Sequence, residues 1–329
     1  MKVMAGDIGG TNTRLAYFVE EQGALRPVVE QIYPSANYSG LEAIVREFIT
    51  THAVSCEAAC FGIAGPVHGD TVKATNLPWV VDARRLASEI GLERAWLIND
   101  LEAIAYSIAV LTPSQLATLN AGDPAARGNA AIIAAGTGLG QSGLYWDGAQ
   151  FHPFACEGGH TDFSPTNELQ DELLEYLRPR FGRVSWERVL SGPGLHTLYK
   201  FLLDSGRGQE SAAVARELAT ADASRQISAH ALAGTDPLCV QALDLFVSLY
   251  GSEAGNLGLK MMARGGIYLG GGIAPQIIDK LRGPAFMAAF KDKGRMSPIL
   301  EATPVRVILD DKTGLLGAAR CAALRTAAG

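Results

Sequence analysis

An asparagine and an aspartate stand together at the end of an apolar segment. Asn99 and Asp100 close the stretch RAWLIND and come directly before the predicted helix LEAIAYSIAVL. A carboxylate at the end of a strand can accept a proton from a substrate hydroxyl, and a neighbouring amide can donate to and accept from a polyol. Asn99 and Glu102 also have the spacing of a capping box, so the pair could serve only to start the helix. A cap does not exclude catalysis by Asp100, and both interpretations stay open.

A second polar cluster lies in EGGHTDF, residues 157–163. Glu157 and His160 are separated by two glycines, and Glu187 follows in SWERVL. Carboxylates and an imidazole supply many hydrogen-bonding atoms, which a sugar site needs because rejection of wrong epimers depends on paired polar groups. Zinc bound by Cys156 and His160 is the competing interpretation, but no second Cys or His pair lies nearby, so we expect no metal there. For Glu187 alone, an acid placed in the first turn of a helix is the simpler explanation.

Two glycine-threonine turns could bind phosphate. The segments GDIGGTNTR, residues 6–14, and AAGTGLG, residues 134–140, each lie between two predicted strands. Adjacent glycines let the backbone approach a phosphate, and threonine hydroxyls with successive N–H groups form an anion-binding concavity. The alternative for the first segment is a tight hairpin with polar turn residues. The nucleotide-binding positions expected from the two turns are Gly6, Asp7, Gly9, Gly10, Thr11, Asn12, Thr13, Gly136, Thr137 and Gly138.

Neither turn matches a common nucleotide fingerprint. No GK[ST] follows either one, which excludes a Walker A loop. The second turn is followed by QSGLYW, which predicts a strand where a dinucleotide fingerprint requires a helix. Asp7, at a strand end, could hold Mg²⁺ directly or, as we expect, through water.

A third glycine run, in GGIYLGGGIAP at residues 265–275, ends a predicted strand before a helix. Bare backbone at such a junction admits a flat ring or a phosphate. Close packing of helix on strand explains the glycines equally well. The candidate positions are Gly270, Gly271 and Gly272.

The elements that carry these residues occur in two rounds. Three strands, KVMAGD, TRLAYFVEE and LRPVVEQIYP, precede the helix LEAIVREFITTH, the strand AACFGIAG, the helix DARRLASEIG and the strand RAWLIND. After an exposed connection at 120–129 the plan repeats in AAIIAAG, QSGLYWDG, QFHPFAC, GGIYLG, the helix PQIIDKLRG, TPVRVIL and the helix GLLGAARCAALRTA, with a helical region inserted at about 167–260. The repeat predicts an α/β fold of two similar domains facing a ligand cleft. We expect a small domain at 1–110, completed by 300–329, and a large domain at 111–299.

Composition narrows the class of protein. A chain of 329 residues suggests about two domains. With 28 Lys and Arg against 34 Asp and Glu, the net charge of −6 argues against partners such as nucleic acid or an anionic membrane. The five cysteines contain no CxxC pair, which favours a reducing compartment over a disulfide framework. No apolar run approaches the roughly 20 residues that span a bilayer, and the chain passes from Lys2 into a strand, so we expect a cytoplasmic protein without a targeting peptide.

Taken together, the motifs resemble the bacterial glucokinases of the non-ROK type. They occur in order over essentially the whole chain: GDIGGTNTR, FGIAGPV, LINDLEAIA, AAGTGLG, CEGGHTDFSP, WERVLSGPGL and GGGIAP. The resemblance implies two RNase H-like domains of the actin and hexokinase type, phosphorylation of glucose at the 6-hydroxyl by ATP with Mg²⁺, and a cytoplasmic homodimer.

The resemblance also assigns roles to single residues. Asp100 matches the catalytic base, and Asn99, Glu157, His160 and Glu187 match glucose-binding positions. The loop at residues 9–11 and the Thr137 turn match phosphate loops, and residues 270–272 lie where the adenosine end is held. ROK proteins carry a cysteine-rich zinc motif soon after the position of His160, whereas TDFSPTNELQDELLEYL contains no cysteine, so structural zinc is not expected.

Other functions remain as alternatives. A sugar-sensing regulator would need a DNA-binding module, and an N-terminal strand leaves no room for one. An actin-like filament protein would have no use for the EGGH cluster. Another hexose, or ADP or polyphosphate as the phosphate donor, stays open. We expect glucose to close the two domains about hinges near residues 110 and 300.

Overall fold

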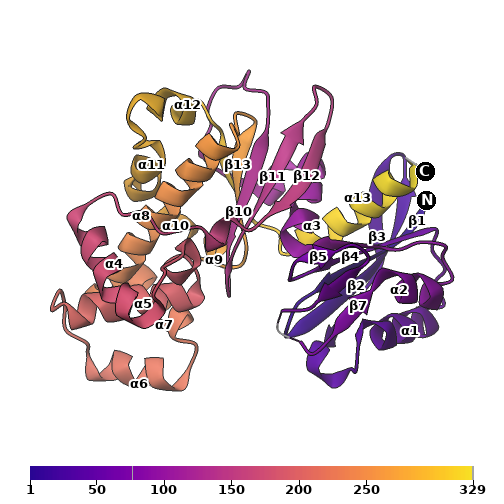
Figure 1. The fold of residues 1–329 in the computed structure, drawn as a ribbon, viewed down its shortest axis with the longest axis horizontal. Helices are drawn as coiled ribbons and strands as arrows, with labels where there is room; N and C mark the ends of the chain where they lie inside the picture. Colours follow the sequence, from indigo (N-terminus) through magenta and orange to yellow (C-terminus); the bar gives the residue numbers. More distant parts are fainter. Residues whose placement is uncertain (76, 328–329) are drawn as a thin grey trace. The chain divides into compact units, whose positions relative to one another are not determined.

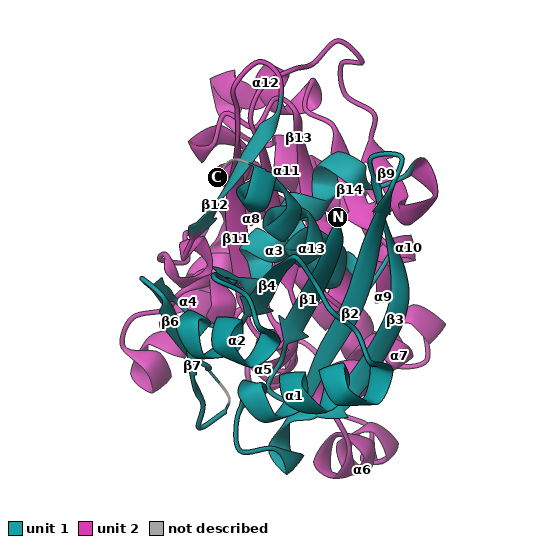
Figure 2. Ribbon diagram, turned by 90° about the vertical axis from the view of Figure 1, so that its right-hand side faces the viewer, with its two compact units in different colours: residues 1–112, 150–155, 310–329 teal, residues 113–149, 156–309 magenta. Residues whose placement is uncertain are grey.

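Two sheets of similar topology organise the chain in the computed structural model, which describes residues 1–75 and 77–327. Contacts divide the chain into a first unit of residues 1–112, 150–155 and 310–329 and a second unit of 113–149 and 156–309 (Figure 2). The segment that returns to the first unit therefore begins at Asp310, not at residue 300 as expected. The reason is that strand β14 (Val305–Ile308) pairs with β13 (Gly266–Gly270) in the sheet of the second unit.

The first unit is built on the strand order β3-β2-β1-β4-β8. Strands β1 (Lys2–Ile8), β2 (Asn12–Glu21) and β3 (Ala24–Pro34) run antiparallel, and β4 (Ala58–Ile63) and β8 (Trp96–Asn99) continue the sheet in parallel. Figure 1 shows helices α1 (Leu41–His52) and α2 (Ala83–Ile90) on one side of this sheet and α3 (Asp100–Ser107) and α13 (Thr313–Ala327) on the other. These elements confirm the predicted order. A small sheet of β5 (Val67–His68), β6 (Thr71–Lys73) and β7 (Val80–Asp82) was not predicted, because its strands are too short to show a period.

The pleat of β1 decides which way its side chains point. Met4 and Ile8 pack with the α1 and α2 core, whereas Val3 and Ala5 pack with α3 and α13. Successive residues of a strand point to opposite faces, so Asp7 shares the face of Val3 and Ala5. The period of the strand therefore directs the Asp7 carboxylate toward α3 and α13.

The second unit repeats this plan. Its sheet contains β11 (Leu139–Trp146), β10 (Ala130–Ala135), β13, β14 and β9 (Leu116–Asn120), in that order. Like β2-β1-β4-β8, the strands β11-β10-β13-β14 form one antiparallel pair followed by two parallel strands. Strand β12 (Phe151–Cys156), whose residues 151–155 are counted with the first unit, follows β11 along the chain, as predicted.

Helices fill the insertion of the second unit, in agreement with the helical region predicted for residues 167–260. They are α4 (Glu168–Phe181), α5 (Gly192–Asp204), α6 (Ala212–Thr220), α7 (Ala223–Ala233) and α8 (Pro237–Lys260). The single helix predicted at 275–283 is wrong in detail: the chain breaks at Ile277 into α9 (Ile273–Gln276) and α10 (Ile278–Leu281), followed by α11 (Pro284–Lys291) and α12 (Ser297–Glu301). Single 3₁₀ turns lie at 35–37, 108–110, 113–115, 158–160, 186–188 and 294–296.

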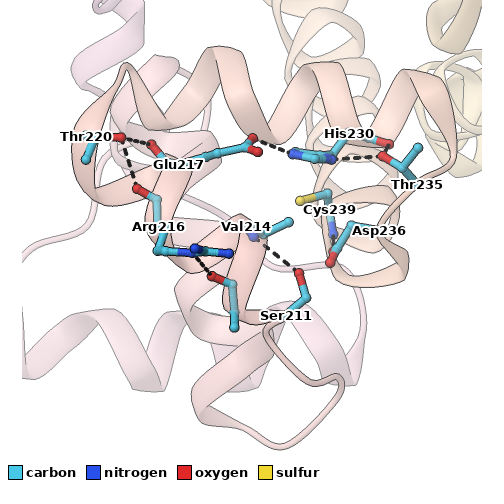
Figure 3. A network of polar contacts seen from close by, with 10 residues as sticks. Ser211, Val214, Arg216, Glu217, Thr220, His230, Thr235, Asp236 and Cys239 are labelled. Carbon is cyan, nitrogen blue, oxygen red and sulfur yellow. Dashed lines mark hydrogen bonds and ion pairs between the residues drawn. The ribbon is translucent and has the colours of Figure 1, made fainter.

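Helix α8 is the centre of the second core, since its residues from Leu249 to Leu257 are buried on nearly every side. Polar contacts fix the surrounding helices, as Figure 3 shows: His230 of α7 bonds Glu217 of α6 at 2.8 Å, and Asp236 caps α8 by accepting the backbone N–H of Cys239 at 2.9 Å. No single helix within the described residues has the length and apolarity to cross a membrane; only the bent pair α7 and α8 passes that test together.

Candidate active site

Asp100 is the first residue of α3, and Asn99 caps this helix. The Asn99 Oδ1 accepts the backbone N–H of Leu101 at 2.9 Å, and its Nδ2 donates to the carbonyl oxygen of Gly65 at 3.3 Å. The Glu102 carboxyl in turn accepts the backbone N–H of Asn99, which completes the predicted capping box. The cap uses the amide oxygen of Asn99 and one of its two N–H groups, so one N–H stays for a ligand.

Two glycines hold the backbone of Asp100 close to the sheet. A Cβ on Gly62 of β4 would lie 2.8 Å from the Cβ of Ala103 and 3.8 Å from the Asp100 Cα. A Cβ on Gly317 of α13 would overlap the carbonyl oxygen of Ala103. Helix α3 therefore packs against β4 and α13 at a distance that only glycine permits, and this contact fixes where Asp100 stands.

Asp7 and Asp100 form an acidic pair within the first unit. Burial, reinforced by the charge of Asp100, raises the pKa of Asp7 from 3.8 to about 6, whereas the Arg14 guanidinium opposes this shift. Arg14 is itself paired with Asp311 at 2.9 Å. Two neighbouring carboxylates repel each other, and a bound divalent cation offsets this repulsion.

The donor set restricts which cation fits. No group of three or more His, Cys, Asp or Glu side chains in the described part of the chain could hold a metal ion. A cation at Asp7 must take most of its ligands from water and substrate phosphate, which is the usual coordination of Mg²⁺. The residues present therefore fit Mg²⁺.

Two hydrogen bonds from Ser35 stabilise the first glycine-threonine turn. The backbone N–H of Ser35 donates to the Thr11 carbonyl at 2.9 Å, and its hydroxyl donates to the Gly9 carbonyl at 2.9 Å. Thr13 is fully buried with its hydroxyl 3.0 Å from that of Ser35. The expectation that the Thr13 hydroxyl faces phosphate is therefore wrong.

The other residues of this turn divide in the same way. A Cβ on the buried Gly6 would meet a Phe61 ring carbon at 2.5 Å, so strand packing by itself requires glycine at this position. Gly9 and Gly10 are partly exposed, and Thr11 and Asn12 are exposed at the end of the turn. These four residues keep their candidate role.

The second turn opens onto a basic cavity of about 280 Å³. Thr137 is exposed at its tip, and the Gly136 carbonyl accepts the backbone N–H of Gly192, the first residue of α5, at 2.8 Å. Three cations, Arg180, Arg188 and Lys200, line the same cavity together with His196 and one carboxylate, Glu187. Burial and then the charges of Lys200 and Arg180 lower the pKa of His196. A cavity with this lining attracts a polyanion.

Sequence reasoning missed these basic residues. The sequence signal that could have located the cavity is the helix start SGPGL. There Ser191 caps α5 by accepting the backbone N–H of Gly194 at 3.0 Å, and proline occupies the first turn. The cations themselves sit on three different elements, so their convergence has no linear pattern.

Glu187, in the 3₁₀ turn Trp186–Arg188, lies against the phosphate turn. Its Oε2 accepts the backbone N–H of Leu139 at 3.0 Å, and a Cβ on Gly138 would come within 2.6 Å of the same oxygen. The EGGH loop is tied to this turn, because the Thr161 carbonyl accepts the backbone N–H of Trp186 at 3.0 Å.

Glu157 and His160 are the exposed ends of the EGGH loop. The Glu157 Oε2 lies 3.9 Å from the His160 Nε2, and both side chains are more than half exposed. The structure therefore brings Glu157, His160 and Glu187 into one region of the second unit, and Asp7, Asn99 and Asp100 into one region of the first.

The third glycine run is mainly structural. Gly270 is buried, and a Cβ on it would lie 3.1 Å from the Ile132 Cδ1 methyl. Gly271 has a φ of +78°, and a Cβ on it would overlap the Ala135 carbonyl oxygen. Only Gly272 faces open space. Close packing thus explains why positions 270 and 271 are glycines, and the exposed backbone of Gly271 and Gly272 keeps these two residues as candidates for the nucleotide.

The comparisons with known proteins decide the family. The family model described as Glucokinase matches residues 4–325. The chain belongs to the glucokinase family. Curated glucokinases of Nostoc sp. strain PCC 7120 and Synechocystis sp. strain PCC 6803 are each 42% identical to this chain, with 98% and 97% of both sequences covered. The resemblance noted in the sequence is thereby confirmed, and the chain is an enzyme that phosphorylates glucose with ATP.

Solved structures agree on the fold. A glucokinase from an Antarctic psychrotroph superposes with a TM-score of 0.86 at 30% identity, over 98% of this chain and 99% of that one. A Balamuthia mandrillaris glucokinase in complex with glucose superposes with a TM-score of 0.78 at 23% identity, covering 98% and 93% of the two chains. This glucokinase-family chain therefore has the predicted actin-like, hexokinase-type α/β fold.

Proposed function

We propose that Asp100 acts as the general base in transfer of the γ-phosphoryl group of ATP to the 6-hydroxyl of glucose. The observation that carries this proposal is the position of Asp100 at the start of α3, beside Asp7 and fixed by Gly62 and Gly317. The helix N-terminus favours the ionised carboxylate, and the Leu101 N–H donates to its Oδ1 at 3.0 Å. An ionised and fixed carboxylate is the form that accepts a hydroxyl proton.

The sugar is bound, in this proposal, by Glu157, His160 and Glu187 together with the remaining N–H of Asn99. These groups supply carboxylate acceptors and amide or imidazole donors, the set that a ring of hydroxyls pairs with. Leaving one of these groups unpaired weakens binding of the wrong epimer, so the same contacts supply specificity. Phosphoryl transfer depends mainly on positioning, so these contacts also support the rate.

The triphosphate is bound by the turns that carry Thr11 and Thr137. Support comes from their exposed hydroxyls and from the basic cavity beside Thr137, where Arg188 and Lys200 offset phosphate charge. Asp7 is the residue that would hold Mg²⁺, through water, and Gly272 is the open backbone position proposed for the adenosine end. When bound, Mg²⁺ supplies positive charge that stabilises the transferring group.

The proposed setting is that of a glycolytic enzyme in the cytoplasm that works as a homodimer. Family membership supports it, and the net charge of −6 supports the expectation that neither nucleic acid nor a membrane is a partner. Light scattering of the purified protein measures the oligomeric state directly, and a molar mass of one chain would refute the dimer.

The decisive experiment compares Asp100→Asn with the unaltered enzyme and with Glu93→Gln, which removes an exposed carboxylate of the same unit. General-base catalysis contributes about 10²- to 10⁴-fold, so Asp100→Asn should lose at least about a hundredfold in kcat while the Kd for glucose stays within a few-fold. Near-normal turnover of Asp100→Asn would refute the role. The same coupled assay, run with a hexose panel and with ATP, ADP or polyphosphate, decides acceptor and donor preference.

A further inference from the structure

A buried glutamate lies beneath the EGGH loop in the core of the second unit. Glu253 of α8 has no exposed surface, and its two carboxylate oxygens accept from different amides: Oε1 from the Gln141 Nε2 at 2.9 Å and Oε2 from the Asn256 Nδ2 at 3.0 Å. The Lys260 Nζ lies 3.9 Å from Oε1. Burying a carboxylate is costly even when it is hydrogen-bonded, and an apolar side chain would fill an α8 core position at lower cost.

Gln141 connects Glu253 to the EGGH loop. It is 2% exposed and follows Leu139 on the face of β11 that points to α8. Because the Gln141 Nε2 donates to Glu253, the carbonyl oxygen of the same carboxamide faces away from Glu253. That carbonyl oxygen stands where a Cβ on Gly158 would be.

The first residues of β11 thus form the floor of the EGGH loop. A Cβ on Gly159 would overlap the Leu139 carbonyl oxygen, just as one on Gly158 would overlap Gln141. Both glycines are needed because the loop backbone rests directly on the strand and on the Gln141 carboxamide. The same strand donates its Leu139 N–H to Glu187.

We propose that Gln141, oriented by Glu253, is a positioning residue. It fixes the position and orientation of the Glu157–His160 loop on β11 and thereby determines the affinity for glucose. The inference rests on the sugar site proposed above. Neither Gln141 nor Glu253 contacts the sugar in this proposal. Gln141 acts by supporting the loop, and Glu253 acts by orienting the Gln141 carboxamide. The loop's outer side is held separately, by the Arg183 guanidinium donating to the His160 carbonyl at 2.7 Å, so loss of the floor tilts the loop and does not release it.

The test measures kcat and the KM for glucose and for ATP in Gln141→Leu, Glu253→Leu and Glu253→Gln. Gln141→Leu removes the support for Gly158 while filling the space, and it should raise the glucose KM at least tenfold with the ATP KM within twofold. Glu253→Leu should do the same, and the double Leu variant should be no worse than either single one, because both act through one carboxamide. Glu253→Gln keeps an oxygen that accepts from Gln141, so its glucose KM should stay within about threefold of the unaltered enzyme.

Tyr250→Phe is the matched control. It lies one turn earlier on α8 and removes a buried hydrogen bond to the same sheet, from the Tyr250 hydroxyl to the Ile133 carbonyl at 3.2 Å, without reaching the loop. It should lower thermal stability and leave the glucose KM unchanged. If the Leu variants do not fold, Gln141→Asn, whose carboxamide is one methylene too short to reach both partners, gives the same comparison.

The outcomes are decisive when Glu157→Ala is assayed alongside. A raised glucose KM in Glu157→Ala with an unchanged one in Gln141→Leu would overturn the positioning role and leave the sugar site intact. An unchanged glucose KM in Glu157→Ala would instead refute the sugar site itself. Parallel rises of the glucose and ATP KM in Gln141→Leu would show general loosening of the unit and would also overturn the inference.

Discussion

The burial of Asp7, together with the charge of Asp100, should make the ligand-free enzyme less stable than its Asp7→Asn variant at neutral and higher pH. Folding raises the pKa of Asp7 from 3.8 to about 6, so the folded state holds its proton more tightly than the unfolded state does. The stability contributed by the protonated form is fully present below pH 3.8 and is lost as the pH rises through about 6. Above that range, the ionised Asp7 destabilises the fold.

The size of the effect follows from the same pKa values. At 1.36 kcal/mol for each tenfold change in proton affinity, the difference between 3.8 and about 6 corresponds to a ceiling of about 3 kcal/mol. Asparagine has nearly the same shape without the charge. We therefore expect Asp7→Asn to be more stable by about 1 to 3 kcal/mol at pH 8, and the advantage to shrink toward zero near pH 4.

Urea unfolding with EDTA present, at pH 4, 6 and 8, measures these differences. Glu175→Gln, which removes an exposed carboxylate of the second unit, is the control and should show no such trend. In an Asp100→Asn background the gain from Asp7→Asn should be smaller, because one source of repulsion is gone. An Asp7→Asn variant that is less stable at pH 8, or equally shifted at all three pH values, would refute this account of the pair.

Three further substitutions test the geometry of the site. Gly138→Ala places a Cβ 2.6 Å from the Glu187 Oε2 and should raise the glucose KM about as much as Glu187→Ala does; an unaltered KM in both would exclude Glu187 from the sugar site. Arg188→Ala removes a cation from the cavity beside the second turn and should raise the ATP KM about tenfold at low salt, with a smaller effect at high salt, whereas equal effects at both would argue against an electrostatic role. Gly317→Ala should destabilise the enzyme by about 1 to 3 kcal/mol and lower kcat, although alanine favours a helix, because its Cβ overlaps the Ala103 carbonyl; a stabilised and fully active variant would contradict the packing around α3.

The sequence alone was sufficient for the repeated α/β plan. Short apolar runs that end in glycine turns identify β1, β10 and β13, and the 3.6-residue period identifies α1 at its observed ends. These signals are local, because burial of a strand on both faces requires a continuous apolar run and burial of one face of a helix imposes a period on neighbouring residues. The motifs at Asp100 and at residues 157–160 were visible for a related reason: each lies within one short segment where a strand ends.

Only the tertiary structure separated binding residues from packing residues within those motifs. Thr13 looks like Thr11 in the sequence, but the pleat turns it inward to Ser35, and Gly6 is a glycine because the Phe61 ring occupies the space of a Cβ. The basic cavity and the contact between Gln141 and Glu253 join residues up to 112 positions apart. Such contacts leave no period, since they depend on the path of the whole chain, and a contact across the core constrains only the two residues that meet there.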